Sequence, residues 1–175
     1  MVGMYGANEN DDIYTAEKLI ELKPEFVRIY PTVVIKETAL YHLFESGEYI
    51  PYSLDKAVDI CAVLLSRFEK NDIKVIRLGL MAGEEINEKN VYGPYHSSFR
   101  ELVENKIYYK KIKELLKENK NKDVVIYCKK ELTSKITGNK KNNLIKLKDE
   151  FNLNSIKVRN VNTKDFYISG EIYGN

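Results

Sequence analysis

The sequence predicts an α/β fold, because segments with strand character alternate with amphipathic helices between residues 1 and 80. The run IKVIRLGL at residues 73–80 is apolar on both faces, which is typical of a buried strand in a parallel sheet. Residues 54–68 carry apolar side chains at helical spacing. The 175 residues suffice for one domain with a real core, or for one domain and a small appendage.

The elements before residue 50 follow from local signals. MVGMYG at residues 1–6 predicts a short strand that opens into a glycine turn. A helix over residues 10–23 begins at a cap of amide and acidic side chains and ends before a proline. FVRIY at 26–30 predicts a second strand, and residues 37–46 predict a short helix that Gly47 stops.

Two longer helices are predicted in the middle of the chain. Ser53 caps the first, and a polar loop over residues 81–99 leads to the second, which begins at Ser97 or Ser98. Each helix has an apolar face that we expect to be buried. In the first helix this face comprises Leu54, Ala57, Val58, Cys61, Leu64, Leu65 and Phe68, and in the second Phe99, Leu102, Val103, Ile107, Ile112 and Leu115.

A proline at position 31 separates two strand-like runs, FVRIY and TVVI. Proline lacks the amide donor of a strand ladder, so we expect the chain to leave the sheet at Tyr30-Pro31-Thr32. Ligands bind at the carboxyl ends of strands in parallel sheets and barrels. The residues at or just past the expected strand ends are Tyr5, Gly6, Tyr30, Pro31, Thr32, Gly79 and Met81.

Charge is distributed unevenly along the chain, whose net charge is +2. Residues 1–103 carry a net charge of −6, whereas residues 104–148 hold 14 lysines and 5 acidic side chains. A basic block beside an acidic body indicates either a module that faces a polyanion or a solvated lysine-rich helix. The lysine-rich linker ENKNKD places the expected domain boundary near residue 120, giving domains over residues 1–119 and 120–175.

Several classes of protein are disfavoured by the composition. No apolar run approaches the roughly 20 residues of a membrane span. The first residues lack the basic and apolar regions of a secretory signal, and Cys61 and Cys128 are far apart. We therefore expect a cytoplasmic protein without a membrane partner, a disulfide framework or a cysteine metal motif.

Four stretches together resemble one known family. They are MVGMYGANENDD, RIYPTVVIKETALYHLFESGEYIPYS, IKVIRLGLM and GPYHSSFREL. The chain resembles radical SAM proteins related to the catalytic subunit of the Elongator tRNA-modification complex, and more closely their shorter bacterial relatives without an acetyltransferase domain. The resemblance covers nearly the whole chain. It implies the C-terminal part of a radical SAM-type β/α barrel, incomplete in this sequence, followed by a small basic α/β appendage.

The sequence departs from this family at the cofactor site. Complete members carry a CxxxCxxC motif whose three thiolates hold a four-iron, four-sulfur cluster that binds and cleaves SAM. This sequence has two cysteines and no such motif, so we expect neither cofactor in this chain alone and no metal site. Tyr5 also replaces a proline expected in the glycine turn, and Glu37 stands where a glycine is usual.

The resemblance implies binding roles but no catalytic residue. Gly3, Gly6 and Arg77 are the expected cofactor-binding residues, although either glycine could instead serve a turn with positive φ, and Arg77 could instead pair with Glu17 or Glu21. His96 could orient substrate or serve as a hydrogen-bonding residue at a helix N-terminus. The expected substrate-binding residues are Tyr30, Thr32, Lys36, His96 and Arg100.

The tail between residues 124 and 160 reads strand, short helix, glycine turn, helix, strand. This order resembles KH modules, in which a GxxG loop between two helices clamps a nucleic-acid backbone. Gly138 begins the corresponding loop, but Lys141 occupies its fourth position in place of glycine. Gly138, Lys140 and Lys141 are therefore the expected RNA-binding residues, the alternative being a small appendage with solvated lysines.

Three functional hypotheses remain from the sequence. The chain is the C-terminal part of a radical SAM enzyme that acts on tRNA or RNA, inactive alone and working with a separately encoded N-terminal half. Alternatively it is a freestanding RNA-binding module, or an inert truncated paralogue whose open sheet exposes edges and apolar surface. Enzymatic activity is left open.

Overall fold

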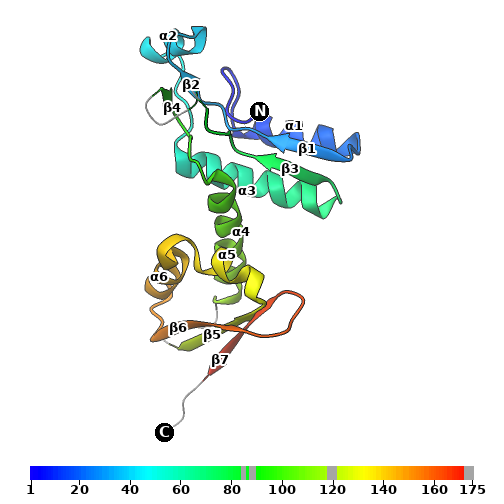
Figure 1. Ribbon diagram of the computed structural model, residues 1–175, viewed down its shortest axis with the longest axis vertical. Coiled ribbons are helices and arrows are strands. Elements are labelled where there is room, and N and C mark those ends of the chain that lie inside the picture. Colours follow the sequence, from blue (N-terminus) through cyan, green and yellow to red (C-terminus); the bar gives the residue numbers. More distant parts are fainter. Residues whose placement is uncertain (84–85, 87–89, 118–121, 172–175) are drawn as a thin grey trace. The chain divides into compact units, whose positions relative to one another are not determined.

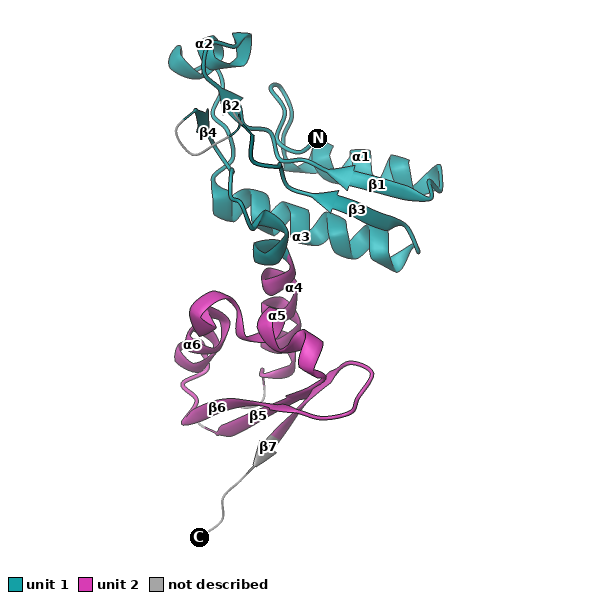
Figure 2. Ribbon diagram, viewed as in Figure 1, with its two compact units in different colours: residues 1–103 teal, residues 104–175 magenta. Residues whose placement is uncertain are grey.

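The computed structural model of the chain, shown in Figure 1, describes residues 1–83, 86, 90–117 and 122–171. The chain divides into two compact units, Met1–Val103 and Glu104–Asn175 (Figure 2). The division falls within helix α4 (Phe99–Leu115). The composition of the linker had indicated a boundary near residue 120, but Ile112 and Leu116 are buried among the residues of the second core.

The first unit contains the expected parallel strand pair. Strands β1 (Phe26–Ile29) and β3 (Lys74–Leu78) run parallel, with Ile29 opposite Leu78. Helix α1 (Glu9–Glu21) contacts helix α3 (Leu54–Lys70), which packs on β3. A strand, a helix and a second parallel strand in this order confirm the α/β class.

The N-terminal segment was expected to form a strand, and this expectation is wrong except at one residue. Val2 alone forms a bridge, parallel to Pro31, on the edge of β1. The amide of the next residue, Gly3, turns away and donates to the Asp12 side chain. The ladder therefore stops after a single residue.

A second, smaller sheet extends the first unit. Strands β2 (Val34–Ile35) and β4 (Val91–Tyr92) pair antiparallel, and helix α2 (Ala39–Glu45) packs on β2. Aromatic rings join these elements, because Tyr41 and Phe44 of α2 lie 5.8 and 5.0 Å, centroid to centroid, from Tyr92. The short helix predicted over residues 37–46 is confirmed.

Helix α3 contributes eight buried residues to the core of the first unit. Six of the seven predicted core residues are buried, and Leu54 is half-buried; Ile60 and Ala62 are buried as well. The sheet is less covered than predicted, since β3 was expected to be apolar and buried on both faces. The exposed side chains of the two strands are Phe26, Arg28, Lys74, Ile76 and Arg77.

The second unit contains a three-stranded sheet in the order β6-β5-β7. Strand β5 (Asp123–Cys128) leads into helix α5 (Thr133–Thr137), helix α6 (Asn142–Glu150) and strand β6 (Ser155–Asn160), as predicted. Single 3-10 turns, η1 (Lys130–Leu132) and η2 (Asn139–Lys141), flank α5. β5 and β6 are parallel, and β7 (Phe166–Glu171), which was not predicted, pairs antiparallel with β5.

The core of the second unit lies between these helices and the sheet. It contains Leu116, which follows the last residue of α4 and is fully buried, whereas Leu115, the residue predicted to be buried, is 51% exposed. The other buried members are Ile112, Val124, Ile126, Cys128, Leu132, Ile136, Leu147, Phe151 and Leu153. Over the described residues, no helix is both long enough and apolar enough to cross a membrane.

Candidate functional site

The carboxyl ends of three parallel segments meet at one edge of the first unit. β1 and β3 end there, and Val2 extends the row beside Pro31. The Val2 amide donates to the Tyr30 carbonyl, and the Thr32 amide donates to the Val2 carbonyl, both at 2.9 Å. Since both bonds use the neighbours of Pro31, the missing proline donor costs nothing in this ladder. The chain thus leaves the sheet at Tyr30-Pro31-Thr32, as expected, after the single bridge at Pro31.

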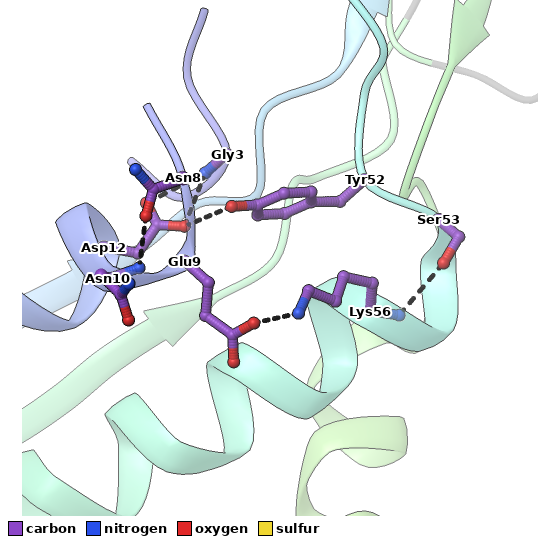
Figure 3. A network of polar contacts seen from close by, with 8 residues as sticks. All are labelled: Gly3, Asn8, Glu9, Asn10, Asp12, Tyr52, Ser53 and Lys56. Carbon is purple, nitrogen blue, oxygen red and sulfur yellow. Dashed lines mark hydrogen bonds and ion pairs between the residues drawn. The ribbon is translucent and has the colours of Figure 1, made fainter. Parts of the chain in front are cut away.

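A buried carboxylate holds the N-terminal segment at this edge (Figure 3). The Gly3 amide donates to both oxygens of Asp12, at 3.0 and 3.2 Å, and the Tyr52 hydroxyl donates to Oδ2 at 3.2 Å. Burial raises the pKa of Asp12, and burial also raises the pKa of Tyr52 to about 12. The Asp12 network stabilises α1 against the segment before it.

Both the amide and the carbonyl of Gly3 form hydrogen bonds with side chains of this unit. Its carbonyl accepts a hydrogen bond of 2.6 Å from the Tyr49 hydroxyl while its amide is bound to Asp12. With φ at +74°, a Cβ atom would lie 2.7 Å from the Tyr52 ring. Glycine is needed here for close packing inside the unit. Gly6, by contrast, has no heavy atom within 4 Å of its Cβ direction, so its side faces open space.

Thr32 lies at this edge, and its buried hydroxyl forms no hydrogen bond within the described structure. It is 6% exposed, and its Oγ1 has no hydrogen-bond partner among the described residues. Gly93 lies close by, because a Cβ there would be 3.7 Å from the Thr32 carbonyl and 2.9 Å from Pro51. Buried hydroxyls are ordinarily satisfied, so an unpartnered one at a strand end marks a place where a bound group could accept or donate.

The other predicted substrate residues lie around this edge in different roles. Tyr30 is half-buried and Lys36 is exposed. His96 Nδ1 accepts the Ser98 amide at 3.0 Å just before α4, which is the helix N-terminal role. Arg100 Nη1 donates to the Val75 carbonyl at 3.0 Å and so ties α4 to β3. Of the five predicted substrate residues, these last two already stabilise the fold.

Arg77 does not make the ion pair considered for it. Glu17 pairs with Arg67, and Glu21 pairs with Lys18. The guanidinium of Arg77 contacts the Met81 sulfur, and Arg28 stands opposite it on β1. Two arginines side by side on the exposed face of the strand pair give this face a positive charge.

The described residues do not fit an iron–sulfur cluster. Cys61 is buried in α3 of the first unit, and burial raises the pKa of its thiol to about 12, so it stays protonated at neutral pH. Cys128 is buried in β5 of the second unit. In the part of the chain that the structure describes, no three His, Cys, Asp or Glu side chains are grouped so as to hold a metal ion.

The second unit has a groove of about 670 Å³ between helices α5 and α6 and the edge strand β6. Its apolar lining consists of Leu144 and Ile145 from α6 and Ile156 and Val158 from β6. Two threonine side chains, Thr133 and Thr137, line one part. The remaining lining residues are all basic, namely Lys140, Lys141, Lys148, Lys157 and Arg159.

Two of the predicted RNA-binding residues line this basic groove, and Gly138 shapes the turn that carries them. Lys140 and Lys141 have φ values of +49° and +61°, which cost free energy in residues with a Cβ atom. Gly138, at φ +70°, packs so tightly on Asn143 that a Cβ would approach its Cγ to 3.0 Å. None of the five basic groove residues pairs with a carboxylate in the described structure, whereas Lys113 and Lys135 pair with Glu150 and Glu104.

Sequence reasoning missed two features of these sites. Asp12 was assigned only to a helix cap, because nothing in the local pattern indicates its contact with Gly3. The contribution of β6 to the groove was also missed. Its pattern SIKVRN places two basic side chains, Lys157 and Arg159, beside Ile156 and Val158, which in retrospect is the signal of a basic strand edge.

Comparison with known proteins relates the first unit to one family. Residues 24–109 match the Radical_SAM C-terminal domain. The chain is 36% identical over 73 residues to a tRNA uridine(34) acetyltransferase of Methanocaldococcus jannaschii, an alignment that covers 40% of this chain and 14% of that protein. It is 40% identical over 58 residues to Elongator complex protein 3 of Dictyostelium discoideum, covering 31% of this chain and 10% of the relative. It is 39% identical over 46 residues to Elongator complex protein 3 of Saccharomyces cerevisiae, covering 26% of this chain and 8% of the relative. The matched part thus spans a small fraction of each of these relatives.

Proposed function

Because residues 24–109 are a portion related to the C-terminal domain of radical SAM proteins, we propose that the protein acts in tRNA modification as the C-terminal part of such an enzyme. In complete members, SAM bound to a four-iron, four-sulfur cluster supplies the radical chemistry. The described residues of this chain hold no cluster-binding group, so the cluster and SAM belong to a polypeptide portion that carries CxxxCxxC.

The observation that carries this proposal is the agreement between the match and the position of the strand ends. The matched segment contains β1, β3 and the loop before α4. The carboxyl ends of the two parallel strands meet at one edge. Two of the relatives that the chain resembles are named for tRNA uridine(34) or for the Elongator complex. Enzymes on parallel sheets place substrate at such edges.

The residues of this edge have separable roles in the proposal. Tyr30, Thr32 and Lys36 contact the substrate, with the unpartnered hydroxyl of Thr32 as its buried polar contact. His96 and Arg100 fix the start of α4 beside the site. Gly6 and Arg77 remain on the side open to a cofactor, whereas the engaged backbone of Gly3 supports the edge from within.

The sheet itself favours a partner. β1 and β3 form a pair whose outer face exposes Phe26 and Ile76, and two strands alone bury little apolar surface. A radical SAM portion encoded separately would cover this face and extend the sheet. Arg28, opposite Arg77 in the strand pair, favours an acidic surface on that partner.

Anaerobic reconstitution tests this function. Purified protein is treated with iron and sulfide, alone and with a CxxxCxxC-bearing radical SAM portion from the same genome, and 5′-deoxyadenosine formed from SAM is measured with tRNA present. We expect no product from the chain alone and product from the mixture. Equal product from the radical SAM portion with and without this chain would contradict the proposal.

A second candidate function is a freestanding RNA-binding module without catalysis. The observation in its favour is the basic groove of the second unit, together with the two buried cysteines that fit no cluster. Its element order and Gly138 loop support the comparison with KH modules. In this case tRNA is retained by the chain alone, and no radical SAM portion changes its modification.

A further inference from the structure

We propose that the basic groove of the second unit binds a single-stranded segment of RNA, with its bases on the apolar lining and its phosphates at the lysines. This inference deepens the proposed function, because it names the form of RNA and the residues that hold it. It concerns residues outside the Radical_SAM C-terminal domain match, which ends at residue 109.

The charges of the groove select an anionic ligand. Five basic residues line it and no acidic residue does. None of these five side chains forms an ion pair within the described structure, so their charges are available to a ligand. The phosphates of a nucleic-acid strand carry the opposite charge, and each neutralised phosphate releases counterions.

The apolar lining argues for unpaired nucleotides. Leu144, Ile145, Ile156 and Val158 give the groove an aliphatic lining. In a duplex the base faces are stacked inside the helix, and only the phosphates would reach the groove. A single strand can turn its bases onto this surface. A volume of about 670 Å³ also lies within the roughly 300–1,000 Å³ of sites that hold small organic groups.

The edge strand adds a means to hold the bases. β6 is the outer strand of the sheet, hydrogen-bonded on one side to β5. Its other side faces the groove with backbone groups that no neighbouring strand uses. Across the groove, the turn with positive φ at Lys140 and Lys141 leads directly into α6, whose N-cap has no side-chain hydrogen bond. Phosphate at this turn would gain from both the lysines and the helix N-terminus.

The apolar lining, called the floor, and the turn with Lys140 and Lys141, called the rim, can be tested separately. Ile145 is 55% exposed, so Ile145→Ser removes apolar lining at little cost to folding. Lys140→Gln with Lys141→Gln removes two charges from the rim. Lys129→Gln with Lys130→Gln removes the same charge from a place outside the groove and is the matched control.

Binding of a fluorescein-labelled 12-nucleotide oligouridylate to the full chain is measured by anisotropy at several salt concentrations. The competitors are the unlabelled oligouridylate, a 12-base-pair RNA duplex and polyglutamate. We expect single-strand competitors to displace the probe at least about tenfold better than duplex or polyglutamate. The rim variant should lower the salt slope by about 1.4, at about 0.7 per phosphate contact. The Ile145 variant should weaken binding about threefold or more with an unchanged slope, and the control should bind nearly as the unchanged protein.

Four results would overturn the inference. Equal displacement by duplex would assign the groove to phosphates alone, and displacement by polyglutamate would assign it to an acidic protein. Unchanged binding by the Ile145 variant would show that the bases do not contact the apolar lining at Ile145. Absence of all RNA binding, with a normal circular dichroism spectrum, would also end the RNA-binding module as a function. The reconstitution with a radical SAM portion would still test the enzyme proposal by itself.

Discussion

The Gly3 amide donates to both carboxylate oxygens of Asp12, and this pair of bonds joins the N-terminal segment to helix α1. Tyr52 donates to the same carboxylate from the segment before α3. Nearby, Lys56 of α3 pairs with Glu9 of α1 (Figure 3). One buried acid thus connects three segments that are distant in the sequence.

Asp12 makes the stability of the first unit depend on pH in an unusual direction. Burial raises the pKa of Asp12 in the folded protein above its value in the unfolded chain. The protonated form therefore contributes stability that is fully present below the unfolded pKa. This stability is lost as the pH rises through the folded pKa. Asp12→Asn keeps an oxygen acceptor for Gly3 and has no ionisation. We therefore expect the melting temperature of the Asn variant, relative to the unchanged protein, to increase between pH 3.5 and pH 7.

The comparison uses the difference between the two proteins at each pH, which cancels the other carboxylates. Thermal unfolding followed by circular dichroism measures it. Glu25→Gln, at an exposed position outside the Asp12 network, provides the control and should show no such rise. A difference that falls with increasing pH would mean that the fold favours the ionised form of Asp12, contrary to the desolvation argument.

Gly79 ends β3 in a conformation that a side chain cannot share. Its φ is +89°, and a Cβ would lie 2.8 Å from the Cβ of the buried Phe99. Gly79→Ala should lower the free energy of unfolding by about 3 kcal/mol, of which about 1–2 kcal/mol is backbone strain. Gly47→Ala has φ +79° and open space, so it should lose only the strain.

Urea denaturation followed by circular dichroism measures both variants, and their difference isolates the contact with Phe99. Equal losses would show that Phe99 can move to accommodate a methyl group. In that event the close approach of β3 to the start of α4 would not depend on glycine.

Thr32 should behave differently from a threonine that is hydrogen-bonded. Its buried Oγ1 has no partner among the described residues, so Thr32→Val should leave stability unchanged or raise it by about 1 kcal/mol. Thr38 caps α2, with Oγ1 2.7 Å from the Ile35 carbonyl and 3.3 Å from the Tyr41 amide. Thr38→Val should lose about 1 kcal/mol.

The Thr32 variant also separates stability from function. If the hydroxyl contacts substrate, Thr32→Val will lower product formation in the reconstituted mixture while melting as high as the unchanged protein. A stability loss comparable to that of the Thr38 variant would instead show that Thr32 has a hydrogen-bond partner in solution.

Local patterns predicted the elements whose stability depends on their own periodicity. The apolar face of α3 and the order of β5, α5, α6 and β6 are correct because helical spacing and glycine turns are encoded within each segment. β7 was missed, because a short strand is fixed by its pairing with β5, which lies about forty residues earlier in the chain. The last core position was misjudged by one residue, since Leu115 is exposed and Leu116, just after the last helical residue, is buried.

The candidate sites were predictable only in part. A proline between two strands indicated the edge at Thr32, and the lysine-rich loop indicated the groove. The Asp12 contact with Gly3 and the joining of α6 with β6 arise from tertiary packing between segments, for which a single sequence holds no periodic signal. The burial of a polar residue, Asn143, in the second unit likewise depends on tertiary packing and could not be predicted from the sequence.

Asn143 should be the polar residue on which the groove turn depends. It is 8% exposed, and its Nδ2 donates to the Asn105 carbonyl at 2.9 Å, with Gly138 packed against its amide group. Asn143→Ala leaves the Asn105 carbonyl without this donor and opens space beside Gly138, so we expect a loss of about 1–3 kcal/mol. Asn142→Ala, at the exposed neighbouring position, should change stability by less than about 0.5 kcal/mol.

Urea denaturation measures both variants. If both lose equally, the stability of the turn resides in its backbone rather than in the Asn143 side chain. If only Asn143→Ala loses, and its affinity for single-stranded RNA falls as well, the buried amide holds Lys140 and Lys141 at the rim of the groove.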